Sequence, residues 1–327
     1  MQDFRDAAFD AIRQILKNDR RVIVLINDMG AMGLDVLRDE YPGHVVNMGI
    51  AEQNLMSVAA GLAQTDRVVF VYGITSHMTL RCLEQFRLDA CAMKLPVILL
   101  GVGSGLAYGA DGPTHHAVND LGAMGSIPGL TILNPADGLA TSALVAWAYR
   151  QRGPAYVRLD KEAHQPLYDS SFFDSQNGFS ILRRGADLAL VSTGMLVHRA
   201  IQVADVLASE GIHASVIDVF RLAPMNIHGI REALQQIPLM VSFEEHAGPG
   251  GLGSRLAELI VDTELPIRCQ RMMLPEKIFF GTATRQWIHD ECGLSLENIC
   301  KTVRGLIGNP MASSSLHEMS MTGRCED

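Results

Sequence analysis

The stretch Asn47–Ala63, NMGIAEQNLMSVAAGLA, contains a single acidic residue, Glu52, at a point where an apolar approach gives way to apolar residues at helical spacing. The pattern predicts a strand followed by a helix, with Glu52 in the first helical turn. A carboxylate there is favoured by the helix dipole by about 0.3 to 1 kcal/mol, and the residues alone favour this capping interpretation. The alternative is a buried carboxyl whose pKa is raised by apolar surroundings, so that it can hold or donate a proton to a ring nitrogen.

Short, nearly continuous apolar runs surround this stretch in the first half of the chain: RVIVLIND, VVFVYG, PVILLGVG, LTILNP and AYVRLD. Runs of this length without polar alternation are typical of parallel strands that are buried on both faces. Helical spacing between the runs, over residues 55–63 and 83–93, gives a β-α-β order. Strand-like runs resume in the second half at LALVSTG, HASVIDVF, LMVSFEEH and IRCQRMM.

These two series predict an α/β fold of two tandem three-layer domains, the first with a mainly parallel sheet. The polar, irregular segment that contains YDSSFFDSQNG separates the two series and is the best linker candidate. We therefore expect a first domain over residues 1–168, a linker over 169–184, a second domain over 185–309 and a flexible tail over 310–327.

Composition excludes several classes of protein. The 327 residues are 48% hydrophobic, and no run reaches the roughly 18 uncharged apolar residues that a membrane span requires. The 36 acidic and 27 basic residues give a net charge of -9 without a basic cluster, so nucleic acid is not an expected partner. The six cysteines lack metal-like spacing and the N-terminal residues do not resemble a secretion signal, so we expect reduced thiols in a cytoplasmic protein.

A glycine-rich loop, YGADGPTHHAVND at Tyr108–Asp120, follows the run PVILLGVG and brings Asp111, His115 and His116 together. Adjacent histidines do not share a helix face and no third ligand stands at a metal-like spacing, so zinc is disfavoured and no metal ligand is assigned. Two interpretations stay open. The histidines either satisfy backbone groups of the loop or donate to a polar substrate, because imidazole titrates near neutrality.

Two further patterns lie in the second half. The turn GPGGLGS, residues 248–254, lacks the lysine and the Ser/Thr of a P-loop, and we interpret it as the start of a helix. The preceding FEEH, residues 243–246, ends a strand, and its two acids either point into a cleft or solvate the edge of the sheet.

Several of these segments resemble one family. NMGIAEQNLMSVAAGLA, LEQFRLDACAMKLPVILLGVGSG, YGADGPTHH and GPAYVRLDKE resemble the pyrimidine-binding domain of transketolases. SFEEHAGPGGLGS and MLPEKIFFGTATRQWIHDECGL resemble the C-terminal domain that transketolases share with 1-deoxyxylulose-5-phosphate synthases. The resemblance covers about residues 4–307 and is closest to the C-terminal subunit of a transketolase divided into two chains.

The resemblance implies a thiamine-diphosphate-dependent enzyme that transfers a two-carbon ketol unit from a ketose to an aldehyde acceptor. It implies that Glu52 hydrogen-bonds N1′ of the cofactor's aminopyrimidine and favours the tautomer whose 4′-nitrogen takes a proton from thiazolium C2. Glu52 and His115 are the implied catalytic residues. The implied cofactor-binding residues are Glu52, Asp28, Met29, Tyr72, His77, Met78 and Arg81, and the implied substrate-binding residues are Asp111, His115, His116, Arg158 and Arg5.

Two departures from the family pattern concern the substrate's phosphate. Gly103 stands where transketolases that act on sugar phosphates have a histidine, and Met32 stands near the position of a serine. Losing two phosphate donors favours an unphosphorylated sugar or an unusual aldehyde as acceptor.

A partner chain is also implied. The family anchors the diphosphate through Mg²⁺ with a GDG motif followed by an Asn-Asn pair, and this chain contains neither. We therefore expect an N-terminal transketolase subunit that carries the GDG…NN motif and holds most of the diphosphate and metal. Because the family's site lies between subunits, we expect an α2β2 heterotetramer that acts on small sugars.

Three other functions stay open. The β subunit of the first component of a 2-oxo acid dehydrogenase has the same layout but a different histidine-containing loop. A synthase of the deoxyxylulose type shares parts of the motifs and would use pyruvate as donor. A noncatalytic regulatory or scaffold subunit would keep the fold without the chemistry, and the presence of Glu52, Asp111 and His115 argues against it.

Overall fold

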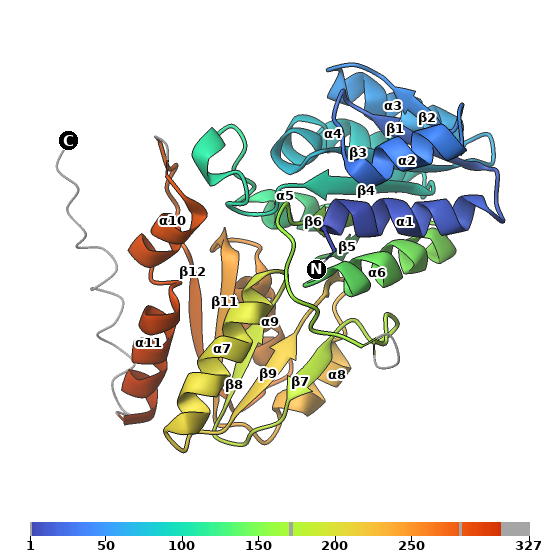
Figure 1. Ribbon diagram of the computed structural model, residues 1–327. Helices are drawn as coiled ribbons and strands as arrows, with labels where there is room; N and C mark the ends of the chain where they lie inside the picture. Colours follow the sequence, from blue (N-terminus) through green and yellow to red (C-terminus); the bar gives the residue numbers. More distant parts are fainter. Residues whose placement is uncertain (1, 170–172, 281–282, 309–327) are drawn as a thin grey trace.

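In the computed structural model, which describes residues 2–169, 173–280 and 283–308, the first half of the chain supplies six strands of a seven-stranded sheet (Figure 1). All neighbouring strands in it are parallel except the edge strand β10, which is antiparallel to β5. Each apolar run of the first half forms one strand. From edge to edge the strands are β10 (Arg221–Ala223), β5 (Thr131–Leu133), β6 (Ala155–Leu159), β4 (Val97–Val102), β3 (Val68–Ile74), β1 (Val22–Ile26) and β2 (Val45–Asn47).

Helices cover both faces of this sheet because successive strand residues point to opposite sides. Val24 and Leu100 face one layer, and Leu25 and Leu99 face the other, which is why the strand sequences are continuously apolar. The first layer consists of α1 (Phe4–Leu16), α2 (Met32–Glu40) and α6 (Gly138–Gln151). The second consists of α3 (Glu52–Ala63), the π-helical segments η1 (His77–Arg81) and η2 (Phe86–Ala92), the short α4 (Leu83–Gln85) between them, and α5 (Asp120–Gly125).

The second half of the chain repeats this plan with five strands, and it lies below the first domain in Figure 1. Its strands are β12 (Arg268–Leu274), β11 (Leu239–Ala247), β8 (Leu188–Ser192), β9 (Ala214–Asp218) and the antiparallel edge strand β7 (Ser180–Arg183). One face packs against α7 (Leu196–Ser209), α10 (Arg285–Glu291) and α11 (Leu296–Gly308), and the other against α8 (Ile227–Leu234) and α9 (Leu252–Asp262). The prediction of two tandem α/β domains with mainly parallel sheets is confirmed.

The structure corrects two details of the expected domain organisation. Strand β7 lies inside the range 169–184 that was expected to be linker, and β10 belongs to the second half of the chain but completes the first sheet. Both are edge strands of three or four residues, too short for a period-two pattern to be visible in the sequence. The tail expected at 310–327 lies outside the described residues.

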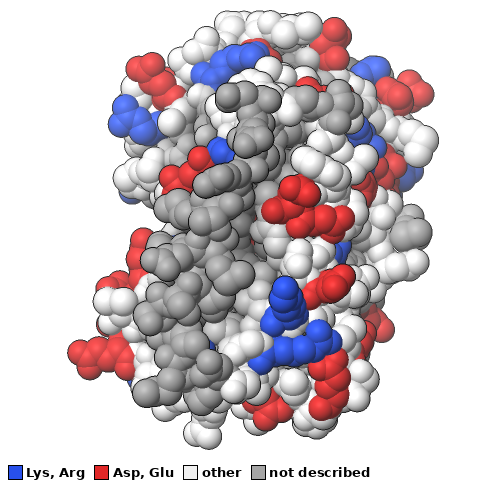
Figure 2. All heavy atoms as spheres, turned by 90° about the vertical axis from the view of Figure 1, so that its left-hand side faces the viewer, with Lys and Arg blue, Asp and Glu red and all other residues white. Residues whose placement is uncertain are grey.

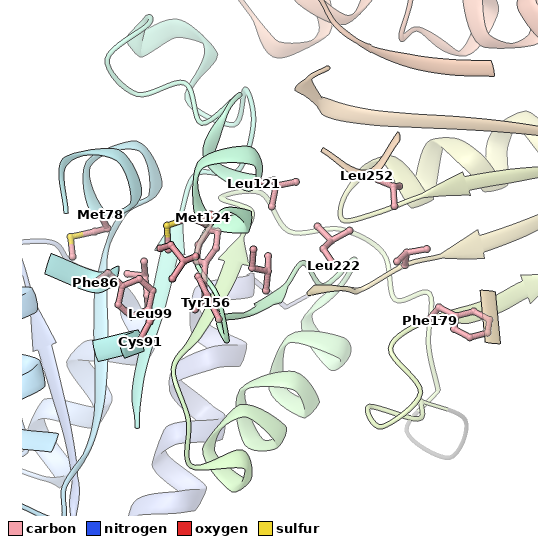
Figure 3. Close-up of a cluster of buried hydrophobic side chains, with 14 of the residues drawn as sticks. Met78, Phe86, Cys91, Leu99, Leu121, Met124, Tyr156, Phe179, Leu222 and Leu252 are labelled. Carbon is pink, nitrogen blue, oxygen red and sulfur yellow. The ribbon is translucent and has the colours of Figure 1, made fainter. Parts of the chain in front are cut away.

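One cluster of buried apolar side chains extends from the first domain into the second (Figure 3). Leu99 and Met124 belong to the first domain, whereas Leu222 and Leu252 come from the second half of the chain. Because the two domains share this core, they fix each other's orientation.

The surface agrees with the charge balance of the sequence. On the face shown in Figure 2, acidic and basic side chains are interspersed over the described residues. None of the helices in the described ranges is long and apolar enough to cross a membrane.

Candidate active site

Glu52 is the first residue of α3, at the C-terminal edge of the first sheet, and only 4% of it is exposed. Its Oε1 accepts a hydrogen bond from Arg81 Nη1 at 2.7 Å, and His77 Nδ1 lies 3.8 Å from the same oxygen. Burial raises the pKa of Glu52, but the hydrogen bond from its own backbone N–H and the guanidinium of Arg81 outweigh burial, so the pKa is lowered. The expectation of a raised pKa is therefore wrong for this chain on its own.

The DGPTHH loop, defined here as residues 103–119, meets Glu52 through His77. The His115 ring centroid lies 5.2 Å from that of His77 and 5.5 Å from that of Tyr108. Ser76 Oγ donates to the carbonyl oxygen of Thr114 at 2.8 Å, which holds the loop against η1. Burial lowers the pKa of His77, and Arg81 and His115 lower it further, which favours the neutral form of the imidazole that lies between Glu52 and His115.

Asp111 ends the short 3₁₀ helix η3 (Gly109–Asp111) and is exposed, and His115 is half-buried. Both side chains are therefore accessible from solvent. His116 is buried, and its Nε2 bonds the Gly109 carbonyl oxygen at 3.0 Å. His116, expected to contact the substrate, bonds the loop's own backbone in this structure, whereas Asp111 is exposed and His115 is half-buried.

Two residues expected at the cofactor's ring point elsewhere. Tyr72 is fully buried on the α1 side of the sheet, edge-on to Phe9 with ring centroids 5.0 Å apart. Met78 is fully buried in the cluster that includes Phe86 (Figure 3). Sequence spacing cannot tell which side chains of a π-helical turn face the core, and of the candidate ring contacts only His77 remains at the site.

Asp28 and Met29 follow β1 at the same edge of the sheet. Asp28 Oδ1 accepts from Asn47 Nδ2 at 2.9 Å, and Asn47 Oδ1 accepts from the backbone N–H of Gly49 at 2.9 Å. This bonding joins the ends of β1 and β2 to the turn that precedes Glu52. The structure shows no hydrogen bond between Asp28 or Met29 and Glu52 within the residues it describes.

Arg158, expected to bind the substrate, is buried in an ion pair in this structure. It lies within β6, is 4% exposed and pairs with Asp120 through Nε at 2.8 Å and Nη2 at 3.1 Å. Its Nη2 also donates to the backbone oxygen of Ala117 at 2.8 Å, so it braces the DGPTHH loop from inside. Arg5 is half-buried and pairs with Asp3, which leaves it near the protein surface.

Lys161 is a cation that the sequence reasoning missed. Its Nζ lies 4.4 Å from the ring centroid of Tyr108, and the Tyr108 ring also packs edge-on to the ring of His115. Within the described residues, Lys161 forms no ion pair. The available signal was its place two residues beyond the C-terminal end of β6, where parallel sheets bind ligands. The same aromatic ring accounts for the glycine at position 103, because a Cβ on Gly103 would clash with the ring of Tyr108.

The patterns FEEH and GPGGLGS build the domain interface. Glu244 accepts from the backbone N–H groups of Leu252 at 2.6 Å and Gly253 at 2.7 Å, so the turn is the start of α9, capped by the chain's own carboxylate. His246 Nε2 accepts from the backbone N–H of Leu121 at 3.1 Å and caps α5 across the interface. Neither acid of FEEH solvates the sheet edge, since both Glu244 and Glu245 are buried.

The side chains around Glu52 fit a cofactor with a protonated ring nitrogen. Arg81 and His77 both lie against Oε1 of Glu52. Within the described residues, no side chain donates a hydrogen bond to the second carboxylate oxygen, Oε2. A carboxylate oxygen in this position can accept a hydrogen bond from a ring N–H. No group of three or more His, Cys, Asp or Glu side chains that could hold a metal ion occurs within the described ranges.

Comparisons with known proteins agree on one family. Residues 1–166 match the family described as transketolase, pyrimidine binding domain, and residues 178–299 match transketolase, C-terminal domain. One of the subunits of an apulose-4-phosphate transketolase from Phocaeicola vulgatus is 32% identical over 91% of this chain and 95% of its own length. A 6-deoxy-6-sulfo-D-fructose transketolase subunit from a Clostridium species is 27% identical over 91% of this chain and 92% of its own length.

A solved structure described as a split gene transketolase, inactive beta4 tetramer, is similar to this chain with a TM-score of 0.84 and 29% identity. The similarity covers 93% of this chain and 98% of that one. This chain therefore belongs to the transketolase family and contains its pyrimidine-binding and C-terminal domains.

Proposed function

We propose that this chain is the C-terminal subunit of a split, thiamine-diphosphate-dependent transketolase that transfers a two-carbon ketol unit from a ketose to an aldehyde. The observation that carries the proposal is the contact between two motifs distant in sequence: Glu52 at the start of α3 and His115 of the DGPTHH loop both approach His77. Together they provide an acid for a cofactor ring and polar side chains for a sugar.

Thiamine diphosphate, when bound, supplies the carbanion stabilisation that cleavage of a carbon–carbon bond next to a carbonyl requires. Glu52 holds a proton at ring nitrogen N1′. Its Oε2 is suited to that contact, and Arg81, which is 47% exposed, has room to turn away from Oε1. Asp111 and His115 orient substrate hydroxyls and move protons at the hydroxyl that becomes a carbonyl.

A second polypeptide completes the proposed site. The GDG…NN motif that anchors Mg²⁺ and diphosphate in the family is missing from this sequence, so we assign those groups to an N-terminal subunit. The relative from Phocaeicola is named as one subunit of its transketolase, and the beta4 tetramer of a split transketolase is described as inactive. Both descriptions support a requirement for a partner, and we propose an α2β2 assembly.

The substrate is proposed to be a small sugar, and two features of the site point in opposite directions about its charge. Met32 and Gly103 replace expected phosphate donors and favour an uncharged acceptor. Lys161, which lies beside Tyr108 and forms no ion pair among the described residues, favours an anionic group, and the two relatives are named for a phosphate and a sulfo sugar. We favour the anionic sugar because Tyr108 fills the space at Gly103 while Lys161 provides a cation beside that ring.

The test is a ketol-transfer assay of the chain assembled with a GDG…NN partner subunit. Ketose phosphates, sulfo sugars and free ketoses are offered as donors and aldoses as acceptors, with pyruvate as an alternative donor. The proposal predicts two-carbon transfer only when both subunits are present. Turnover of pyruvate without ketose turnover would instead assign the chain to the dehydrogenase or synthase type. An assembled complex that converts neither would support the scaffold alternative.

A further inference from the structure

We propose that the second domain acts on the site through Arg285, a positioning residue that fixes the DGPTHH loop against the first domain. This inference rests on the proposed function, because it assigns the loop's geometry to that reaction. Among the described residues, no hydrogen bond or ion pair joins Arg285 to Asp111 or His115.

Arg285 is the first residue of α10 and bridges the two sheets with one guanidinium. It contacts Asp160, just beyond β6 of the first sheet, through Nη2 at 2.6 Å and Nη1 at 3.1 Å. It also contacts Glu245, on β11 of the second sheet, through Nε at 2.7 Å and Nη2 at 2.7 Å. His289, one turn further along α10, adds a 2.6 Å contact from Nε2 to Glu245 Oε1.

Both carboxylates in this network also lie against the DGPTHH loop. Ser104 Oγ donates to Asp160 Oδ2 at 3.1 Å, and a Cβ at Gly105 would clash with the carboxylate of Glu245. The near end of the loop is therefore held by the same two groups that Arg285 clamps. Gly105 is required there because the carboxylate occupies the space of a side chain.

The middle of the loop, at Gly109, rests on the start of α10. A Cβ at Gly109 would lie 2.8 Å from the backbone oxygen of Ala283 and 2.9 Å from the backbone nitrogen of Arg285, so the two backbones are in direct contact. Gly109 also accepts the hydrogen bond of His116, which ties this contact to the segment that carries His115. In Figure 1 the loop, in teal, extends from the first domain towards α10.

Burial keeps water away from the ion pairs of this network. Arg285 is 9% exposed and both carboxylates are almost fully buried, so neither carboxylate can exchange the guanidinium for bulk water. Burial raises the pKa of Glu245, but Arg285 and His289 outweigh burial and hold it well below its usual range. Loss of the bidentate geometry would free the loop at Ser104, Gly105 and Gly109, in the same loop as Asp111 and His115. A displacement of about 1 Å at reacting groups can cost about 10²-fold in rate.

The experiment compares Arg285→Lys and Ser104→Ala with the wild-type chain and with Arg304→Gln. Lysine keeps the charge but cannot bridge two carboxylates with a planar fork. Ser104→Ala removes only the loop's own bond to Asp160 and guards against misfolding of the arginine variant. Arg304 pairs with Glu210 on the exposed side of α11 and serves as the control.

Hydrogen–deuterium exchange is measured on the full chain, and kcat and KM are measured on the complex with the partner subunit. We expect Arg285→Lys to exchange the backbone amides of residues 103–119 at least about tenfold faster, with α3 unchanged, and Ser104→Ala to give a smaller change in the same direction. kcat/KM should fall by about 10²-fold with unchanged cofactor binding. Arg304→Gln should match wild type.

Three results would overturn the proposal: unchanged exchange in the loop, equal acceleration in the loop and α3, or faster loop exchange with unaltered kcat/KM. The exchange measurement needs no turnover. A wild-type complex without ketol transfer would therefore refute the proposed function, while the exchange data would still decide whether Arg285 holds the loop.

Discussion

Replacing Glu52 with glutamine separates the cofactor role of this carboxyl from its structural role. Arg81 is 47% exposed, so solvent screens its pairing with Glu52, and losing that pair should cost no more than about 1 kcal/mol of unfolding free energy. Glutamine keeps the size of the side chain and an oxygen that can accept from Arg81. It cannot exchange a proton with a ring nitrogen. General acid–base catalysis typically contributes about 10²- to 10⁴-fold, so we expect kcat of the assembled enzyme to fall by that factor.

The assay is two-carbon transfer by the complex, followed by chromatography of the ketose donor and the aldose product. Urea unfolding of the variant chain and its co-purification with the partner are measured in parallel. Glu232→Gln is the matched control, because Glu232 is an exposed glutamate on α8, in the second domain. Near-normal turnover by an intact Glu52→Gln complex would refute the reasoning, as would equal losses of turnover in the two variants.

The remaining predictions concern other residues of the chain. Lys161→Met should raise KM for anionic sugars by about 10- to 150-fold and leave KM for uncharged sugars unchanged, since one charge-assisted contact is worth about 1.5 to 3 kcal/mol. Equal effects on both substrates in steady-state kinetics would contradict this. Asp120→Ala should lower the unfolding free energy by about 3 to 5 kcal/mol because it leaves Arg158 buried without its partner; a small change in urea unfolding would restore Arg158 as a candidate ligand. Burial raises the pKa of Asp218 to about 8, although the hydrogen bond from Tyr168 opposes the rise. In the unfolded chain the pKa of an aspartate is about 3.9, so the folded state binds the proton of the Asp218 carboxyl more tightly than the unfolded state does. The stability that Asp218 contributes to the wild-type chain should therefore be lost as pH rises from about 4 towards 8. Urea unfolding at pH 5 and pH 8 should show that the unfolding free energy of Asp218→Asn, relative to wild type, is higher at pH 8 than at pH 5. A difference that does not change with pH would disprove the assignment.

The sequence predicts the parts of the fold that depend on burial alone. Strands covered on both faces read as continuous apolar runs, and β1, β3 and β4 are visible for that reason. The position of Glu52 is predictable too, because the change from an apolar run to helical spacing marks the end of a strand and the first turn of α3. By contrast, β7 and β10 owe their existence to pairing partners far away in the sequence.

Side-chain direction is the part that one-dimensional patterns miss. Arg158 lies inside β6 and points to a buried carboxylate, whereas Lys161 lies past the strand end and is exposed, although only three positions separate them. Tyr72 and Met78 are also near the site in sequence but face the core. The pairing of Glu52 with Arg81 is a tertiary contact across 29 positions. Together with the hydrogen bond from the backbone N–H of Glu52, it reverses the pKa direction that an apolar pocket alone would give.

The most direct test of the split-site claim is a calorimetric titration of thiamine diphosphate with Mg²⁺. It is carried out on this chain, on a GDG…NN partner subunit, and on their purified complex. Shared binding residues predict tight, saturable binding by the complex and much weaker binding by either chain alone. Equal affinity in this chain alone and in the complex, or no binding by a complex that has formed, would contradict the claim that Glu52 completes a cofactor site supplied by two polypeptides.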